Sequence, residues 1–146
     1  MTRFIGLDHG SRRIGVAIGD TDTGMAFART AIQRRNLDRD LALIGELCTN
    51  EGVERVVIGL PLNMDGTEGS QADLVRAFGE RLAVIGLEVV YEDERLSTWE
   101  AGERLGQVGR KARRGSGELD STAARVILQQ YLDARYGTGR PAEETE

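Results

Sequence analysis

Two short apolar segments near the N-terminus, residues 4–7 and 14–18, constrain the fold of this chain most strongly. Their β-branched and aromatic residues, with a tight loop between them, predict two adjacent strands. Gly10 lies where the chain must reverse, and a glycine there tolerates positive φ and lets a phosphate approach the backbone. Asp8 ends the first segment, and a carboxylate among apolar strand neighbours is costly unless it is paired or binds a cation. We therefore interpret Asp8 as a functional residue.

Length and composition indicate one ordinary globular domain. The 146 residues suffice for a sizeable core, and we expect a domain over residues 1–136 followed by a polar, disordered tail over residues 137–146. No apolar run approaches the roughly 20 residues of a membrane span, and no signal peptide is evident. We therefore expect a cytoplasmic protein without a membrane partner. The net charge of −5 argues against coating of nucleic acid by the whole surface, so a polyanion would need a local basic patch.

The residues after the first two strands predict a third strand and then a helix. A strand over residues 25–32 completes an antiparallel meander. The following helix begins after a capping Asn36 or Asp38 and runs to about residue 50, with Gly52 past its end. Cys48, the only cysteine, falls on the apolar stripe of this helix. We expect it in the core, and an intramolecular disulfide is excluded.

The second half of the chain alternates between strands and helices. Residues 53–60 form a nearly continuous apolar run, as expected for a strand buried on both faces. A helix over residues 71–85 and a strand over residues 87–93 follow, which predicts parallel strands with crossover helices. Two more helices are expected, one from Ser97 and one over residues 118–135. The inward stripe of the helix over residues 71–85 is predicted to be Leu74, Val75, Phe78, Leu82 and Ile85.

Three acids occupy positions with mostly apolar surroundings. Asp8 is in the first strand, Glu94 ends the last strand, and Asp120 lies one turn before Ala124 on the inner face of the last helix. If the first strand lies beside residues 53–60 and the last helix packs across the sheet, the three carboxylates can converge at one edge. Oxygen ligands of this kind suit magnesium or manganese. A pair of such ions can activate a water and stabilise the leaving oxygen of a phosphodiester.

Four motifs in order connect these acids to a known family. The chain contains GLDHGSRRIGVAIGD, VVIGLPLNMDGTEG, YEDERLST and LDSTAARVIL. Together they resemble the YqgF family, also called RuvX, of Holliday junction resolvases and pre-16S ribosomal RNA nucleases in the ribonuclease H-like superfamily. The resemblance covers about residues 4–136 and implies an α/β fold with a five-stranded mixed sheet, in the order 3-2-1-4-5, flanked by helices. It implies that Asp8, Glu94 and Asp120 are the catalytic metal ligands, with two Mg²⁺ or Mn²⁺ ions as cofactors.

Other residues near the acids leave alternatives open. Glu92 shares a strand face with Glu94 and is the rival ligand. We favour Glu94, because it matches the family motif and precedes the helix start at Ser97. His9 is interpreted as a loop residue, with contact to a phosphate or a metal-bound water as the alternative. Trp99 is expected to pack against the sheet rather than to stack on a base.

A basic cluster precedes the helix that carries Asp120, and we define it as Arg110, Lys111, Arg113 and Arg114. A solvated charged loop is the simpler interpretation, but a phosphodiester needs positive charge close to where it is cut. Arg12 and Arg13, in the loop after Asp8, can extend this patch. Asn63 and Thr67 follow a parallel strand, where α/β proteins place ligand-contacting loops, although a plain turn would also explain them. All eight are candidate nucleic-acid contacts.

The sequence therefore predicts a metal-dependent nuclease, with RNA, through 16S ribosomal RNA precursor maturation, as the preferred substrate. A resolvase of branched DNA is the first alternative, and it would require a homodimer of suitable symmetry. A non-catalytic nucleic-acid-binding module is the second, but all three acids are present. The nucleotide-binding domains of sugar kinases and actin-like proteins also begin with Asp-x-Gly, but they need two lobes and this chain is long enough for one. A monomer and a homodimer both remain open.

Overall fold

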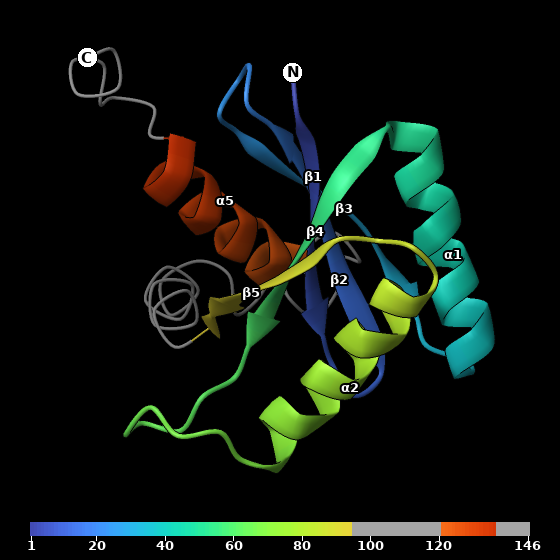
Figure 1. The fold of residues 1–146 in the computed structure, drawn as a ribbon, viewed down its shortest axis with the longest axis vertical. Coiled ribbons are helices and arrows are strands. Elements are labelled where there is room, and N and C mark those ends of the chain that lie inside the picture. The colour runs from blue at the N-terminus through green and yellow to red at the C-terminus, as the bar shows by residue number, and fades with distance from the viewer. Residues whose placement is uncertain (95–120, 137–146) are drawn as a thin grey trace, which may run out of the picture.

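A computed structural model of the chain describes residues 1–94 and 121–136. Five strands and three helices form in these residues, and Figure 1 shows the sheet between the helices. The elements are β1 (Arg3–His9), β2 (Arg13–Asp20), β3 (Ala26–Gln33), α1 (Leu37–Glu51), β4 (Val53–Leu60), α2 (Ser70–Val84), β5 (Val89–Asp93) and α5 (Thr122–Tyr136).

The five strands form one mixed sheet in the order β3-β2-β1-β4-β5. β1 pairs antiparallel with β2, and β2 pairs antiparallel with β3. β4 lies parallel to β1, and β5 lies parallel to β4. The predicted meander and strand order are confirmed. Because β1, β4 and β5 run in one direction, their carboxyl ends meet at the same edge of the sheet.

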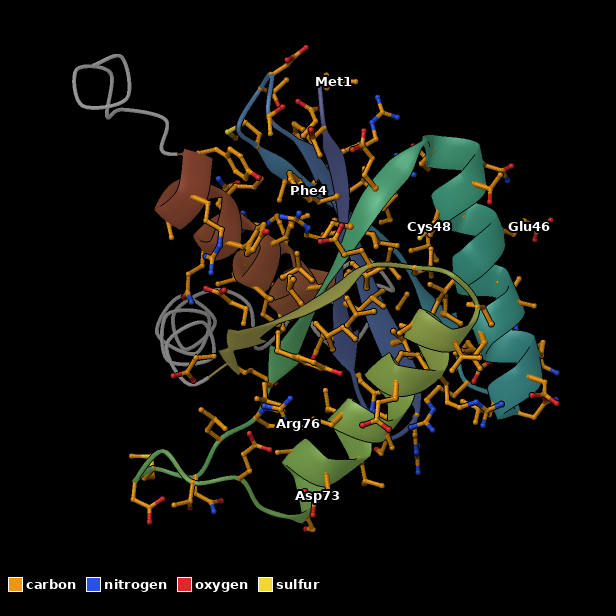
Figure 2. The ribbon with its side chains drawn as sticks, in the orientation of Figure 1. Met1, Phe4, Glu46, Cys48, Asp73 and Arg76 are labelled. Atoms are coloured by element: carbon orange, nitrogen blue, oxygen red, sulfur yellow. The ribbon has the colours of Figure 1, made fainter. Side chains whose placement is uncertain are left out.

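Helices cover both faces of the sheet. α1 and α2 lie on one face and α5 on the other (Figure 1). Strand alternation divides the buried side chains accordingly, so that Ile5 and Leu7 join the core under α1 and α2, whereas Phe4 joins the core under α5. Cys48 is buried in the first of these cores, as predicted, and Figure 2 shows it between α1 and the sheet.

α5 approaches the sheet closely because Gly6 has no side chain. A Cβ at Gly6 would lie 2.7 Å from the Cβ of Leu128 and 3.0 Å from the carbonyl oxygen of Ala124. Any larger residue would push the helix away from β1. This close packing buries the face of β1 to which Phe4 and Gly6 belong, and strand alternation places Asp8 on that same face.

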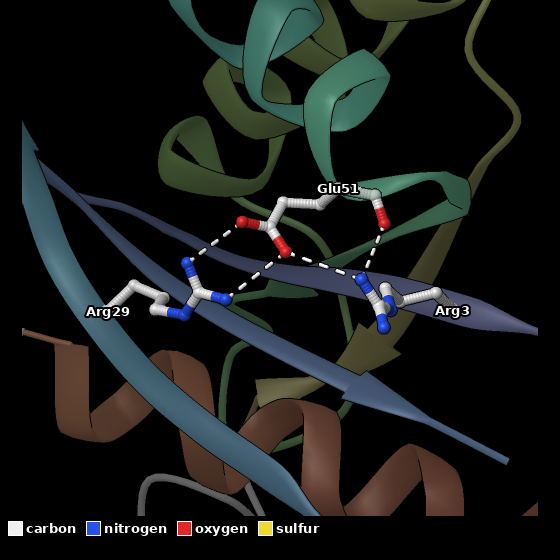
Figure 3. Close-up of polar contacts among 3 residues, drawn as sticks. All are labelled: Arg3, Arg29 and Glu51. Carbon is white, nitrogen blue, oxygen red and sulfur yellow. Dashed lines mark hydrogen bonds and ion pairs between the residues drawn. The ribbon is translucent and has the colours of Figure 1, made fainter. Parts of the chain in front are cut away.

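The ends of α1 follow the predicted signals. The Asn36 side chain accepts a hydrogen bond from the Arg39 amide at 2.9 Å, and Gly52 ends the helix with φ of 69°. The carboxylate of the last helical residue, Glu51, bonds to Arg29 of β3 at 3.2 Å and to Arg3 of β1 at 3.4 Å (Figure 3). α1 is thereby fixed to two strands of the meander.

The structure corrects the predicted inward stripe of α2. Val75, Phe78 and Leu82 are buried, but Leu74 is 58% exposed and Ile85 is 49% exposed. Gly79 faces the sheet instead, because the Tyr91 ring occupies the space that a side chain there would need. α2 therefore presents Gly79 to the sheet together with larger apolar residues, and Leu74 points toward the solvent.

The last strand begins at Val89, where its parallel pairing with Val56 starts, two residues later than predicted. The predicted helix from Ser97, the packing of Trp99, the start of the last helix near residue 118 and the tail over residues 137–146 lie outside the described residues. None of the helices within residues 1–94 and 121–136 combines the length and apolar character that a membrane crossing requires.

Candidate active site

Asp8 lies near the carboxyl end of β1, next to Gly15 of β2. Strand alternation places it on the face that Phe4 and Gly6 present to α5. The carboxyl group is largely withdrawn from water, and this burial raises the pKa of Asp8 above its ordinary value. A bound cation stabilises the ionised form of a carboxylate held in this way, because it offsets the desolvation of the charge.

Glu94 follows β5 directly, at the same edge of the sheet. A Cβ built on Gly59 of β4 would lie 3.3 Å from the Oε1 atom of Glu94. The Glu94 carboxylate therefore extends over β4, in the direction of β1, across the space that a side chain at Gly59 would fill. Gly59 thus permits the approach of Glu94 to the middle of the sheet edge.

One pocket of about 410 Å³ brings Asp8 and Glu94 together. Two of the three predicted acids therefore share a site, as their positions at the ends of parallel strands require. The third, Asp120, lies outside the described residues. The pocket is lined by Asp8, His9, Gly10, Ser11, Arg34, Pro61, Gln71, Leu74 and Glu94.

The residue that follows Asp120 in the sequence is anchored beside this site. Ser121 is fully buried, and its hydroxyl oxygen accepts a hydrogen bond from the Val16 amide at 3.0 Å. Val16 pairs with Leu7, the neighbour of Asp8 in β1. Within residues 1–94 and 121–136, no group of three or more His, Cys, Asp or Glu side chains is arranged to hold a metal ion. The described part of the site therefore supplies two carboxylates.

Glu92, the rival of Glu94, is engaged by α5. Its Oε2 atom accepts a hydrogen bond from Gln130 Nε2 at 2.7 Å, and Arg135 lies 3.9 Å from its Oε1 atom. Glu92 is not among the residues that line the pocket with Asp8. Its carboxylate connects β5 to α5, which favours Glu94 as the ligand.

His9 lines the pocket but packs on the opposite face of the sheet from Asp8. Its ring lies 4.5 Å, centroid to centroid, from the ring of Phe78 in α2. Burial, with a smaller contribution from the positive charge of Arg34, lowers the pKa of His9 to about 4. The imidazole is therefore uncharged at neutral pH and does not compete with a cation beside Asp8.

No sequence pattern selects Arg34, yet it lines the pocket with both acids. Its Nη1 atom donates to the carbonyl oxygen of Gly10 at 2.7 Å and to that of Ser11 at 3.4 Å. Arg34 lies between β3 and α1, and its contact with the β1–β2 turn depends on the pairing of the meander. Only the folded sheet reveals this proximity.

The remaining predicted contacts occupy different surroundings. Arg12 is exposed in the turn between β1 and β2, and Arg13, predicted in the same loop, is exposed at the first position of β2. Asn63 and Thr67 are exposed in the loop after β4, where the Asn63 amide donates to the Thr67 hydroxyl at 2.9 Å. These two side chains therefore hold the loop's own turn and do not line the pocket. The basic cluster lies outside the described residues.

The sheet order and the covering helices define an α/β domain of the ribonuclease H-like class. Among solved structures, the chain is similar to "T. thermophilus RuvC in complex with Holliday junction substrate", with a TM-score of 0.57 and 15% identity over 94% of this chain and 98% of that one. It is also similar to the fowlpox virus Holliday junction resolvase, with a TM-score of 0.51 and 10% identity over 91% and 99% of the two chains. At these identities the likeness concerns the fold.

Sequence comparison assigns the family. A family model described as "RuvX: Holliday junction resolvase" matches residues 2–134, so the chain belongs to the RuvX family. Curated relatives named "Putative pre-16S rRNA nuclease" include one from Anaeromyxobacter dehalogenans, 48% identical over 91% of this chain and 98% of the relative. Another, from Moorella thermoacetica, is 48% identical over 90% and 94% of the two chains.

Proposed function

We propose that this protein is a divalent-metal-dependent nuclease that hydrolyses phosphodiester bonds of RNA during maturation of the 16S ribosomal RNA precursor. The observation that carries the proposal is the pocket shared by Asp8 and Glu94, two acids from distant parts of the chain. Membership of the RuvX family and the names of the closely similar relatives support the same activity.

The proposed metal ligands are Asp8, Glu94 and Asp120. The donor set consists of carboxylate oxygens, which suits Mg²⁺ or Mn²⁺, and the family resemblance favours two ions. The anchoring of Ser121 to Val16 supports Asp120 as the third ligand, because consecutive Cα atoms lie only about 3.8 Å apart. When bound, the ions would activate a water and stabilise the leaving oxygen of the phosphodiester.

The protein's own groups prepare the pocket for this chemistry. Asp8 and Glu94 supply negative charge, while His9 remains neutral at neutral pH. Burial makes ionised Asp8 unfavourable without a partner, so a cation is held more strongly there than at an exposed carboxylate. The proposed contacts of the nucleic acid outside the pocket are Arg12, Arg13, Asn63, Thr67 and the basic cluster.

The test compares single carboxylate variants with a matched exposed control. Asp8→Asn, Glu94→Gln and Asp120→Asn should each reduce Mg²⁺- or Mn²⁺-dependent cleavage at least 100-fold, the scale typical of losing one essential catalytic group. Glu46→Gln changes an exposed carboxylate on α1 (Figure 2) and should cleave like the wild type. Cleavage by Asp8→Asn at the wild-type rate would contradict the proposed mechanism.

The substrate is tested separately, because the family description names Holliday junctions. We expect the wild type to cleave a precursor of 16S ribosomal RNA faster than a four-way DNA junction or an unstructured RNA. A junction cut symmetrically on two strands, by a protein that elutes as a dimer in gel filtration, would instead assign the protein as a resolvase.

A further inference from the structure

A second groove adjoins the pocket that contains Asp8 and Glu94, which we call the carboxylate pocket. The proposed metal chemistry does not use this groove. This groove has a volume of about 360 Å³ and lies between the start of α1 and α2, which cover the same face of the sheet (Figure 1). It shares His9, Arg34 and Leu74 with the carboxylate pocket, so the two spaces lie side by side. The groove is lined by His9, Arg34, Leu37, Leu74, Ala77, Phe78, Glu80 and Arg81.

The walls of the groove are apolar and partly open to the solvent. Leu74 is 58% exposed and Leu37 is 38% exposed, although both belong to helices with a buried stripe. Behind them, the rings of His9 and Phe78 are in contact. The volume lies within the range of roughly 300–1,000 Å³ that is usual for small-ligand sites, and so fits one ligand group of nucleotide size.

Arg34 stands where the groove meets the carboxylate pocket. Its Nη1 atom is held by the carbonyl oxygens of Gly10 and Ser11, and it forms no ion pair with a carboxylate among residues 1–94 and 121–136. Carbonyl oxygens orient the guanidinium without neutralising its charge. The other arginine of the groove, Arg81, lies 3.5 Å from Asp38. Positive charge without an acidic partner is therefore located at the end nearest the acids.

We propose that this groove binds the nucleotide next to the scissile phosphodiester, with its phosphate on Arg34 and its base against Leu37 and Leu74. The inference rests on the proposed nuclease function and adds the position of one substrate residue. A strand whose phosphodiester lies at Asp8 and Glu94 has its next nucleotide within reach of the adjoining groove. An apolar wall accepts any base through its face, so this subsite selects single-stranded or unpaired nucleotides rather than a sequence. Glu80, which also lines the groove, disfavours a phosphate at the far end and so favours this orientation.

The test measures binding of two fluorescent oligomers by anisotropy. One is a single-stranded oligouridine and the other is an abasic ribose-phosphate oligomer of the same length. Comparing the two distinguishes contacts to the bases from contacts to the phosphates. The full chain carrying Asp8→Asn serves as the background, without divalent ions, to prevent cleavage. The variants are Arg34→Gln, Arg34→Lys and Leu74→Ser. Matched controls are Arg35→Gln, which removes the neighbouring charge outside the groove, and Val84→Ser, which changes a residue of α2 that is 79% exposed.

We expect Arg34→Gln to weaken binding of both oligomers about tenfold, as for a lost hydrogen bond to a charged group, with a smaller loss for Arg34→Lys. Leu74→Ser should weaken oligouridine binding about fivefold and leave abasic binding unchanged. The two controls should stay within about twofold of the background. Equal effects of Arg34→Gln and Arg35→Gln would overturn the proposal. Leu74→Ser weakening the binding of both oligomers equally would also overturn it.

These outcomes are separable from the failure of the proposed function. A wild-type protein that lacks metal-dependent cleavage contradicts the nuclease assignment whatever the anisotropy shows. If the wild type cleaves RNA, the nuclease assignment stands. If Leu74→Ser then binds both oligomers as tightly as the background does, the groove does not take part in substrate binding.

Discussion

The Asp8 carboxyl group combines a proposed function with an unfavourable position in the fold. Burial raises its pKa in the folded protein, whereas an unfolded chain has an Asp pKa of about 3.9. The folded state therefore holds this proton more tightly than the unfolded state does. As pH rises through the interval between the two pKa values, the free energy of unfolding decreases, so ionised Asp8 destabilises the folded protein relative to the protonated form.

Asp8→Asn removes this ionisation, so we expect the variant to be more stable than the wild type at pH 7 in the presence of EDTA. The difference should become smaller toward pH 3, where wild-type Asp8 is protonated in both states. Urea unfolding followed by circular dichroism at the two pH values measures it. Glu46→Gln, an exposed carboxylate on α1, should not show this pattern. A variant less stable than the wild type at pH 7 would contradict the interpretation of Asp8.

The Cys48 thiol reports opening of the core under α1. Burial raises the pKa of Cys48 to about 11, and its side chain is 2% exposed. The reactive thiolate is thus scarce at pH 8, and reagents have no access to it in the closed state. Since Cys48 is the only cysteine, a disulfide-exchange reagent should label native protein far more slowly than protein in urea. Equal labelling rates would show that this face of α1 does not pack against the sheet.

Among the elements, α5 depends on Gly6 for its position on the sheet. Gly6→Ala would place a methyl group 2.7 Å from the Cβ of Leu128, and we expect a loss of about 1–3 kcal/mol in the free energy of unfolding. Gly45→Ala is a matched control within α1, because the new methyl would lie at an ordinary 3.5 Å from Ile85 Cδ1. The control should be neutral, or stabilising by up to about 1 kcal/mol through helix propensity. Equal effects of the two variants would contradict the close packing of α5.

Most elements could be predicted because their signals are local. Asn36 and Gly52 mark the ends of α1 through their own side chain and backbone preferences, and the structure confirms both. The inward stripe of α2 was partly wrong because it depends on a partner. Periodicity suggested Leu74, but Tyr91 of β5 occupies the space beside Gly79, which faces the sheet, whereas Leu74 is 58% exposed. A helical pattern alone contains no information about the shape of the facing strand.

At the scale of the whole molecule, the meeting of Asp8 and Glu94 followed from topology. Parallel strands end at one edge, so acids at the ends of β1 and β5 were predicted to converge, and they share one pocket. Arg34 could not be predicted in the same way. It precedes α1, and its bond to Gly10 arises only because the meander returns β3 to the β1–β2 turn. Contacts made by connecting segments depend on details of register that residue spacing does not specify.

The basic cluster is expected to add long-range attraction for nucleic acid. Replacing Arg110, Lys111, Arg113 and Arg114 with Gln should weaken RNA binding and make its dependence on salt concentration less steep, because fewer counterions are released on binding. Titrations at several salt concentrations measure both effects. A fourfold replacement of exposed arginines outside the proposed nucleic-acid contacts would change net charge equally and should have a smaller effect. Unchanged affinity would favour the simpler interpretation of the basic cluster as a solvated charged loop.

Binding of Mn²⁺ measured by isothermal titration calorimetry reports whether Asp8 and Glu94 hold a divalent cation together, and it does not depend on the choice of substrate. We expect the wild type and Glu46→Gln to bind Mn²⁺ with the same affinity, and Asp8→Asn and Glu94→Gln each to bind at least tenfold more weakly, as for the loss of a charged ligand. Wild-type affinity in both carboxylate variants would contradict the claim.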